Sequence, residues 1–280
     1  MRTISTDEII KNIKEMCIEA NYYLSEDMKD KIDHACQVEE SPLGRQILSQ
    51  LEENMQIAES SQIPICQDTG MAVVFLKIGQ DVHIEGMNLE DAVNEGIRQG
   101  YVEGYLRKSV VKDPLRRVNT GDNTPAMLYI ELVPGDKIEL TVAPKGFGSE
   151  NMSRIAMLKP SDGIEGVKNF ILKTAEEAGP NPCPPIVIGV GIGGTFDKAA
   201  LLAKKALLRS TDERTADEFY AELENEMLRK VNALGIGPQG FGGKTTALAV
   251  NIEAMPTHIA GLPVAVNINC HVTRHKSATI

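Results

Sequence analysis

Residues 63–78 read I-P-I-C-Q-D-T-G-M-A-V-V-F-L-K-I, and the rest of the chain is organised around this stretch. Its second half, residues 71–78, is a run of apolar and β-branched residues, which is typical of a buried strand. Its first half sets Cys66, Gln67 and Asp68 on a loop that enters the strand, where a rigid scaffold can hold reactive groups. A thiol, an amide and a carboxylate can there supply a metal ligand, a hydrogen bonder and an acid or base. The alternative is a small buried cysteine beside an Asx-type turn.

The composition is that of an acidic globular chain. Its 280 residues are 42% hydrophobic and 24% charged, with a formal net charge of -10, which argues against binding to a nucleic-acid backbone. No apolar run reaches the roughly 20 residues that cross a bilayer, and the N-terminus has no apolar core of a secretory signal. Five scattered cysteines argue against a disulfide framework. We therefore expect a cytoplasmic chain with reduced cysteines and no membrane partner.

Hydrophobic periodicity predicts the secondary structure. Helices are expected over residues 5–59, 89–106, 162–178, 196–208 and 216–234. Strands are expected at residues 71–78, 127–133, 137–143, 186–190, 246–254 and 263–269, with the second and third forming a hairpin. Because strands and helices do not alternate regularly, we predict an α+β fold with mixed sheets and flanking helices. One domain would span residues 1–280, with a helical N-terminal part over residues 1–60.

Three of the five cysteines share a context. Cys66, Cys183 and Cys270 lie at predicted element boundaries, whereas Cys17 and Cys36 lie on predicted helices and are expected to pack in the interior. No zinc-knuckle spacing joins the three, so only the fold could bring them together. Three thiolates suit an iron–sulfur cluster in which one iron has no protein ligand and can act as a Lewis acid. Unrelated buried thiols are the alternative.

Glycine-rich loops and one histidine add further candidates. Residues 145–153 and 235–246 combine backbone N–H groups with a lysine and hydroxyls, so each is either an anion site or a plain turn. Residues 189–194 match G-x-G-x-x-G, but no second strand ending in an acid follows, so we exclude a dinucleotide site. His258 lies on a loop between two predicted strands. It is either a surface residue or, beside a cluster, a proton relay or substrate hydrogen bonder.

Together these motifs resemble the iron–sulfur-dependent (class I) fumarate hydratase family, which includes L(+)-tartrate dehydratase. The resemblance covers nearly the whole chain, through ICQDTG at 65–70, RRVNTGDNTP at 116–125, KGFGSEN at 145–151, NPCPP at 181–185, GIGGTFDKAALLAKKALLR at 191–209 and residues 235–275. It is to the alpha subunit, or to the N-terminal half of the single-chain members. The resemblance implies a [4Fe-4S] cluster on Cys66, Cys183 and Cys270. It implies catalytic roles for Asp68 and His258, and substrate contacts from Gln67, Asp68, Arg107, Gly146 and Gly148.

The activity that the resemblance implies is the reversible hydration of fumarate to (S)-malate, a step of the tricarboxylic acid cycle. Asp68 is the expected acid that assists the departure of hydroxide. Dehydration of L(+)-tartrate is the alternative within the family, and a non-catalytic zinc-binding structural subunit is the alternative from another class. The family's second half, with further cations and a base, is absent here. The resemblance therefore implies a beta subunit that completes the site, in an α2β2 assembly.

Overall fold

The computed structural model describes residues 2–280 and divides into two compact units. Unit 1 comprises Met1–Leu24, Met55–Phe147 and Arg274–Ile280, and unit 2 comprises Ser25–Asn54 and Gly148–Thr273. The division passes through two helices, α3 (Pro42–Ser61) and α5 (Phe147–Glu150). That residues 1–280 act as one domain stays a prediction.

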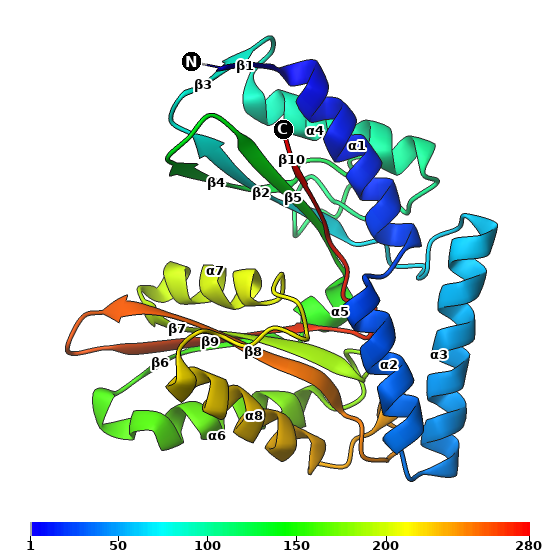
Figure 1. The fold of residues 1–280 in the computed structure, drawn as a ribbon, viewed down its shortest axis with the longest axis vertical. Helices are drawn as coiled ribbons and strands as arrows, with labels where there is room; N and C mark the ends of the chain where they lie inside the picture. Colours follow the sequence, from blue (N-terminus) through cyan, green and yellow to red (C-terminus); the bar gives the residue numbers. More distant parts are fainter. Residues whose placement is uncertain (1) are drawn as a thin grey trace. The chain divides into compact units, whose positions relative to one another are not determined.

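Unit 1 is built on a mixed sheet with the strand order β10-β5-β2-β4. Its strands are β2 (Met71–Gly79), β4 (Met127–Val133), β5 (Ile138–Lys145) and β10 (Lys276–Thr279). The helices α1 (Thr6–Tyr22) and α4 (Leu89–Glu103) pack on each other and cover the sheet (Figure 1). β1 (Arg2–Ser5) and β3 (Val82–Glu85) form a small parallel pair beside them. The predicted strand at residues 71–78 is confirmed as β2, and nearly all of it is buried.

One predicted pairing is wrong. β4 and β5 follow each other in the chain and were expected to form a hairpin, but β2 lies between them, parallel to β4 and antiparallel to β5. The physical reason is burial. β2 carries the most continuous apolar run and takes one of the two inner positions, whereas β4 is largely exposed at the sheet edge.

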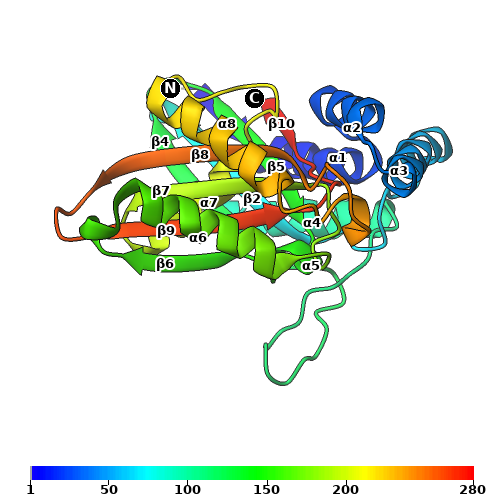
Figure 2. The same ribbon diagram turned by 90° about the horizontal axis from the view of Figure 1, so that it is seen from below.

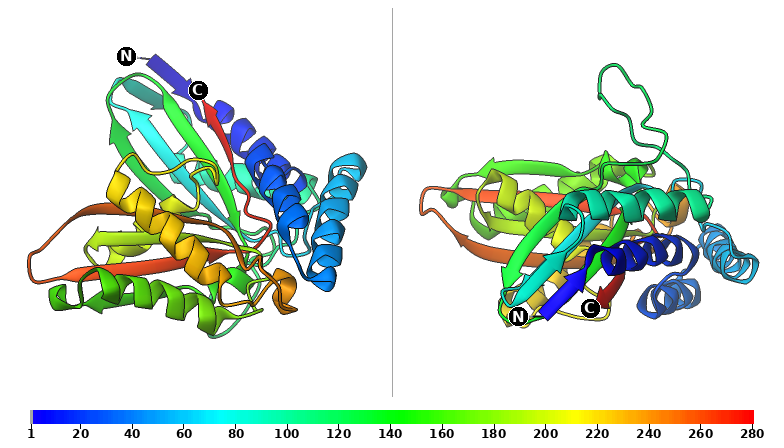
Figure 3. Two further views of the ribbon diagram at one scale, coloured as in Figure 1. Left: turned by 60° about the horizontal axis from the view of Figure 1, so that its bottom comes forward. Right: turned by 90° about the horizontal axis from the view of Figure 1, so that it is seen from above.

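A long connection between α4 and β4 projects away from the other elements of unit 1 (Figures 2 and 3). We call residues 105–119 the arm. A bridge between Val111 and Asn119 and a 2.8 Å hydrogen bond from the Lys112 amide to the Val118 carbonyl order it internally. At its tip, Leu115 is 90% exposed. The arm carries five basic residues and one acidic residue, in a chain whose net charge is -10: Arg107, Lys108, Lys112, Arg116 and Arg117, with Asp113.

Unit 2 contains a second mixed sheet with the strand order β6-β9-β7-β8. Its strands are β6 (Arg154–Leu158), β7 (Ile186–Gly194), β8 (Ala247–Thr257) and β9 (Leu262–Asn269). The helices α6 (Gly163–Ala178) and α8 (Glu218–Asn232) cover one face, and α7 (Phe196–Ala206) covers the other (Figure 1). The helix α2 (Glu26–Val38) lies beside the edge strand β8. The predicted α+β class with mixed sheets and flanking helices is confirmed.

None of the helices described for residues 2–280 combines the length and apolar character that spanning a bilayer requires.

Glu39, just after α2, is hydrogen-bonded to the glycine-rich loop of residues 235–246 within unit 2. Its carboxylate is 2% exposed and accepts backbone N–H groups from Ser41 at 3.0 Å, Lys244 at 3.0 Å and Thr245 at 2.9 Å. Burial alone would raise the pKa of Glu39, but these hydrogen bonds outweigh it and hold the pKa below its usual value. The ionised carboxylate therefore stabilises unit 2.

Replacing Glu39 by glutamine is expected to lower the free energy of unfolding at pH 7 by about 1–3 kcal/mol, because the amide NH2 would face backbone donors. Since the folded pKa lies below the unfolded one, the stabilisation is full above the unfolded pKa of about 4.3 and is lost as pH falls through the folded pKa. Urea unfolding of wild type and Glu39→Gln should therefore converge in acid. The exposed neighbour Glu40→Gln is the matched control, and an equal loss there would contradict the assignment.

Candidate active site

The loop of residues 66–70 fixes the carboxylate of Asp68 in one orientation. Oδ1 accepts the Gly70 amide at 3.0 Å, and Oδ2 accepts the Phe147 amide at 2.9 Å. The Asp68 amide itself donates to Cys66 Sγ at 3.4 Å. The thiol and the carboxylate that the sequence singled out therefore lie on one tight loop, and the Phe147 amide of α5 gives the carboxylate a second donor.

Two glycines allow the chain around Lys145 to lie against this loop. Gly70 has a φ of +76°, and a Cβ there would lie 2.7 Å from the Lys145 carbonyl group. A Cβ at Gly146 would lie 3.3 Å from Asp68 Oδ2. The structure thus brings the predicted residue Gly146 next to Asp68. The start of the glycine-rich loop of residues 145–153 therefore lies against the carboxylate of Asp68.

Arg107 is attached to the same loop through its backbone. The buried Thr69 hydroxyl accepts the Arg107 amide at 2.9 Å and donates to the Arg107 carbonyl at 3.2 Å, while the Arg107 side chain is exposed. The hydroxyl of Tyr101 donates to the Thr69 carbonyl at 2.8 Å. Burial raises the pKa of Tyr101, so this hydroxyl stays a neutral donor. Gln67, Asp68, Arg107 and Gly146, all predicted to contact substrate, therefore meet in unit 1.

The sequence did not identify Arg274 as a residue of the candidate site. It is 5% exposed, and its Nη2 donates to the Asp68 carbonyl at 2.6 Å. An arginine among polar residues near the end of a chain has the pattern of a surface residue. The available signal was its place in C-H-V-T-R-H, four residues after a candidate ligand, Cys270.

In unit 2 the segments of Cys183 and Cys270 lie at the same end of the sheet. Cys183 precedes β7, Cys270 follows β9, and Val187 of β7 pairs with Asn269 of β9. The His271 amide donates to the Cys183 carbonyl at 3.4 Å, and His271 Nδ1 lies 3.0 Å from the same oxygen. The structure thus brings two predicted ligand segments together.

The glycine-rich loop of residues 235–246 supports the Cys183 turn. The Gln239 amide and its side-chain Nε2 both donate to the Pro184 carbonyl at 2.7 Å, and the same Nε2 lies 3.3 Å from His271 Nδ1. Gly148 belongs to unit 2 as well, and a Cβ there would approach the Asn181 carbonyl to 3.8 Å. It therefore lies near the turn that carries Cys183.

His258 lies elsewhere in unit 2. It follows β8 and precedes β9, whereas Cys270 comes after β9, so the two residues lie at opposite ends of that strand. Eight extended residues span about 26 Å. The His258 side chain is exposed, and its Nδ1 accepts the Ala260 amide at 3.2 Å. The structure therefore does not bring His258 to Cys183 or Cys270, although twelve positions of sequence had suggested proximity.

The donor chemistry of the three loop cysteines fits an iron–sulfur cluster. Cys183 is exposed and Cys66 and Cys270 are partly exposed, whereas Cys17 is fully buried in unit 1 and burial raises its thiol pKa. The Asp68 amide donates to Cys66 Sγ, as backbone amides do to cluster sulfurs. Cys66 belongs to unit 1, and Cys183 and Cys270 to unit 2. Across residues 2–280 no three His, Cys, Asp or Glu side chains already form a metal-binding group.

Comparison with known proteins identifies the class of protein. Residues 10–279 match the family model described as Fumarate hydratase (Fumerase). The chain is 48% identical over 269 residues to the putative L(+)-tartrate dehydratase subunit alpha of Methanocaldococcus jannaschii, covering 94% of both chains. It is 33% identical over 271 residues to the L(+)-tartrate dehydratase subunit alpha of Escherichia coli K12, covering 95% of this chain and 88% of that one. This chain therefore belongs to the fumarate hydratase family, as its motifs suggested. Members of the family are hydro-lyases, which add water to a carbon–carbon double bond or remove it.

Proposed function

We propose that the chain is the alpha subunit of an iron–sulfur hydro-lyase acting on a four-carbon dicarboxylate. Hydration of fumarate to (S)-malate is the first candidate reaction, and dehydration of L(+)-tartrate is the second, because the similar proteins are named for it. The observation that carries the proposal is the placement of Asp68. Its carboxylate accepts the amides of Gly70 and Phe147, and its own amide donates to the Cys66 thiol of the same loop.

Cys66, Cys183 and Cys270 are the cluster ligands in this proposal. When bound, a [4Fe-4S] cluster with three cysteine ligands supplies a Lewis-acidic iron. One contact within unit 2 supports part of the set. The amide of His271, the residue after Cys270, donates to the Cys183 carbonyl at 3.4 Å.

Asp68 carries the proton in the chemical step. In dehydration its carboxyl group protonates the departing hydroxyl, a base removes a proton from the neighbouring carbon, and water leaves. The exposed Gln67 amide and Arg107 guanidinium bind and orient the substrate carboxylates, and Gly146 and Gly148 leave room for the substrate. A catalytic role for His258 stays a prediction, because it lies at the opposite end of β9 from Cys270.

A second polypeptide completes the site. The similar proteins are named as alpha subunits, which favours a partner chain. We propose a beta subunit that supplies further cations and the base, in an α2β2 assembly. The basic arm with its exposed apolar tip is the docking element that we assign to this partner.

Replacing Leu115 by aspartate is therefore expected to weaken association with the beta subunit about tenfold or more, because it puts a charge at the apolar centre of the contact. The arm keeps its internal hydrogen bonds, so the alpha chain itself should unfold at the same temperature. Titration calorimetry of the two subunits measures the effect. Leu132→Asp, an exposed apolar residue of β4 in the same unit, is the matched control. Unchanged affinity for Leu115→Asp would remove the arm from the interface.

An anaerobic assay of the reconstituted complex with malate and L(+)-tartrate side by side tests the function. We expect a brown protein with a broad visible absorption band and turnover of one of the two substrates. A colourless protein with stoichiometric zinc and no turnover would instead establish the structural zinc subunit.

A further inference from the structure

Arg274 is a buried cation whose hydrogen bonding is incomplete. Nη2 donates to the Asp68 carbonyl, but the buried atoms Nε and Nη1 have no acceptor among residues 2–280. A guanidinium cannot lose its proton in a protein, so the charge persists. Each buried N–H without an acceptor has lost its hydrogen bond to water with no replacement, and an unbalanced buried charge is costlier still. Such a group is retained where something else balances it.

The groups beside Arg274 leave Nε and Nη1 without an acceptor. Tyr101 stays neutral: burial is the main cause that raises its pKa, and the Arg274 charge only opposes this. Asp68 has both carboxylate oxygens engaged by the amides of Gly70 and Phe147, and Arg274 bonds its backbone carbonyl, not its carboxylate. The Asp68 carboxylate therefore offsets part of the charge but accepts no hydrogen bond from Nε or Nη1.

The position of Arg274 indicates where an anion would interact with its guanidinium. It bonds the residue two positions after Cys66 and itself follows Cys270 by four positions. In a low-dielectric interior a charge acts over several ångströms without direct contact. The positive charge of Arg274 therefore lies beside the loop of residues 66–70, where the proposed function requires an anion.

We propose that Arg274 is the fixed counter-cation of an anion bound at the loop of residues 66–70, and that it positions this loop through the Asp68 carbonyl. The inference rests on the proposed function for the nature of the anion. The anion is either the thiolate-ligated cluster or a substrate carboxylate. The cluster and the substrate would each bring negative charge beside Asp68, and each can be added to the apo protein without the other.

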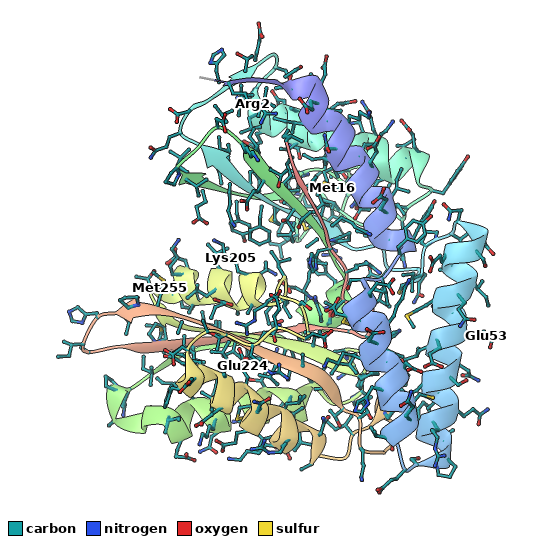
Figure 4. All side chains as sticks on the ribbon, in the orientation of Figure 1. Arg2, Met16, Glu53, Lys205, Glu224 and Met255 are labelled. Atoms are coloured by element: carbon teal, nitrogen blue, oxygen red, sulfur yellow. The ribbon has the colours of Figure 1, made fainter. Side chains whose placement is uncertain are left out.

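The test compares anion-induced stabilisation in wild type, Arg274→Met and Arg274→Lys. Thermal unfolding of the alpha–beta complex is followed for the apo form, the cluster-loaded form and the apo form with malate or L(+)-tartrate. A ligand raises the midpoint according to its affinity for the folded state. We expect the anion to bind Arg274→Met about tenfold more weakly or worse, with Arg274→Lys retaining most of the stabilisation. Arg2→Met removes the same charge from β1 of unit 1, where Arg2 is exposed (Figure 4), and should change nothing.

Loss of stabilisation only on cluster loading identifies the cluster as the anion, and loss only with the dicarboxylate identifies the substrate. Equal stabilisation of wild type and Arg274→Met in both arms overturns the inference. Arg274→Met also removes the donor to the Asp68 carbonyl. If that apo variant fails to fold, Arg274→Gln, which keeps an amide donor without the charge, gives the same comparison. Equal stabilisation of wild type and Arg274→Gln likewise overturns the inference. A wild-type protein that takes up no iron refutes the proposed cluster, while the dicarboxylate arm still decides the role of Arg274.

Discussion

Replacing Asp68 by asparagine is expected to lower kcat by about 10²-fold or more with the cluster content unchanged. The amide keeps the shape of the side chain and one acceptor oxygen for the Gly70 or Phe147 amide, but it has no transferable acid proton. Cys66 and its sulfur are untouched. Anaerobic turnover, together with iron and sulfide analysis of the same preparation, separates the loss of the acid from the loss of the site.

Asp122→Asn is the matched control for this variant. Asp122 also lies in unit 1 and accepts a backbone amide, that of Thr124, at 3.1 Å, but its carboxylate pairs with Arg98. Its substitution should leave kcat within a few-fold of wild type. Near-normal turnover of Asp68→Asn across the pH range would exclude Asp68 as the acid.

Alanine at Cys66, Cys183 or Cys270 is expected to abolish cluster assembly, because three ligands already leave one iron open. Cys17→Ala should retain iron and sulfide and lose only packing, about 1–2 kcal/mol, since Cys17 is fully buried in the core of unit 1. Cys36→Ala provides a second control at a partly exposed thiol. Iron and labile sulfide per chain are the measurements. Full iron content in Cys183→Ala would contradict the ligand set.

Local patterns predicted local structure well. The apolar run after Gly70 is β2, and the helical spacing of Ile9, Ile13 and Cys17 is the buried face of α1. These elements are decided by residues within a few positions of each other, which a single sequence displays. Short edge strands such as β10 (K-S-A-T) have no apolar pattern, and they were missed.

Long-range pairing could not be predicted in the same way. The insertion of β2 between β4 and β5 depends on which strand buries most apolar surface, a comparison across the sheet. The bond from Arg274 to Asp68 joins residues 206 positions apart. His258 and Cys270 show the converse case, because two residues twelve positions apart in the sequence lie at opposite ends of β9. Cys66 and Asp68, which belong to one motif, are in contact in the structure. His258 and Cys270, which are only near each other in the sequence, are not.

Gly70 and Thr69 also bear on how such a site can change during evolution. Gly70 has no room for a side chain beside Lys145, and the Thr69 hydroxyl is committed to both backbone groups of Arg107. Mutational drift at either position would damage the fold and the loop together, so selection for folding alone would remove it. The side chains of Gln67 and Arg107 are exposed, and the one hydrogen bond of the Gln67 amide here is the 3.6 Å contact that its Oε1 accepts from Cys66 Sγ. New substrate preferences would therefore arise at these two positions while the loop that presents them stays fixed.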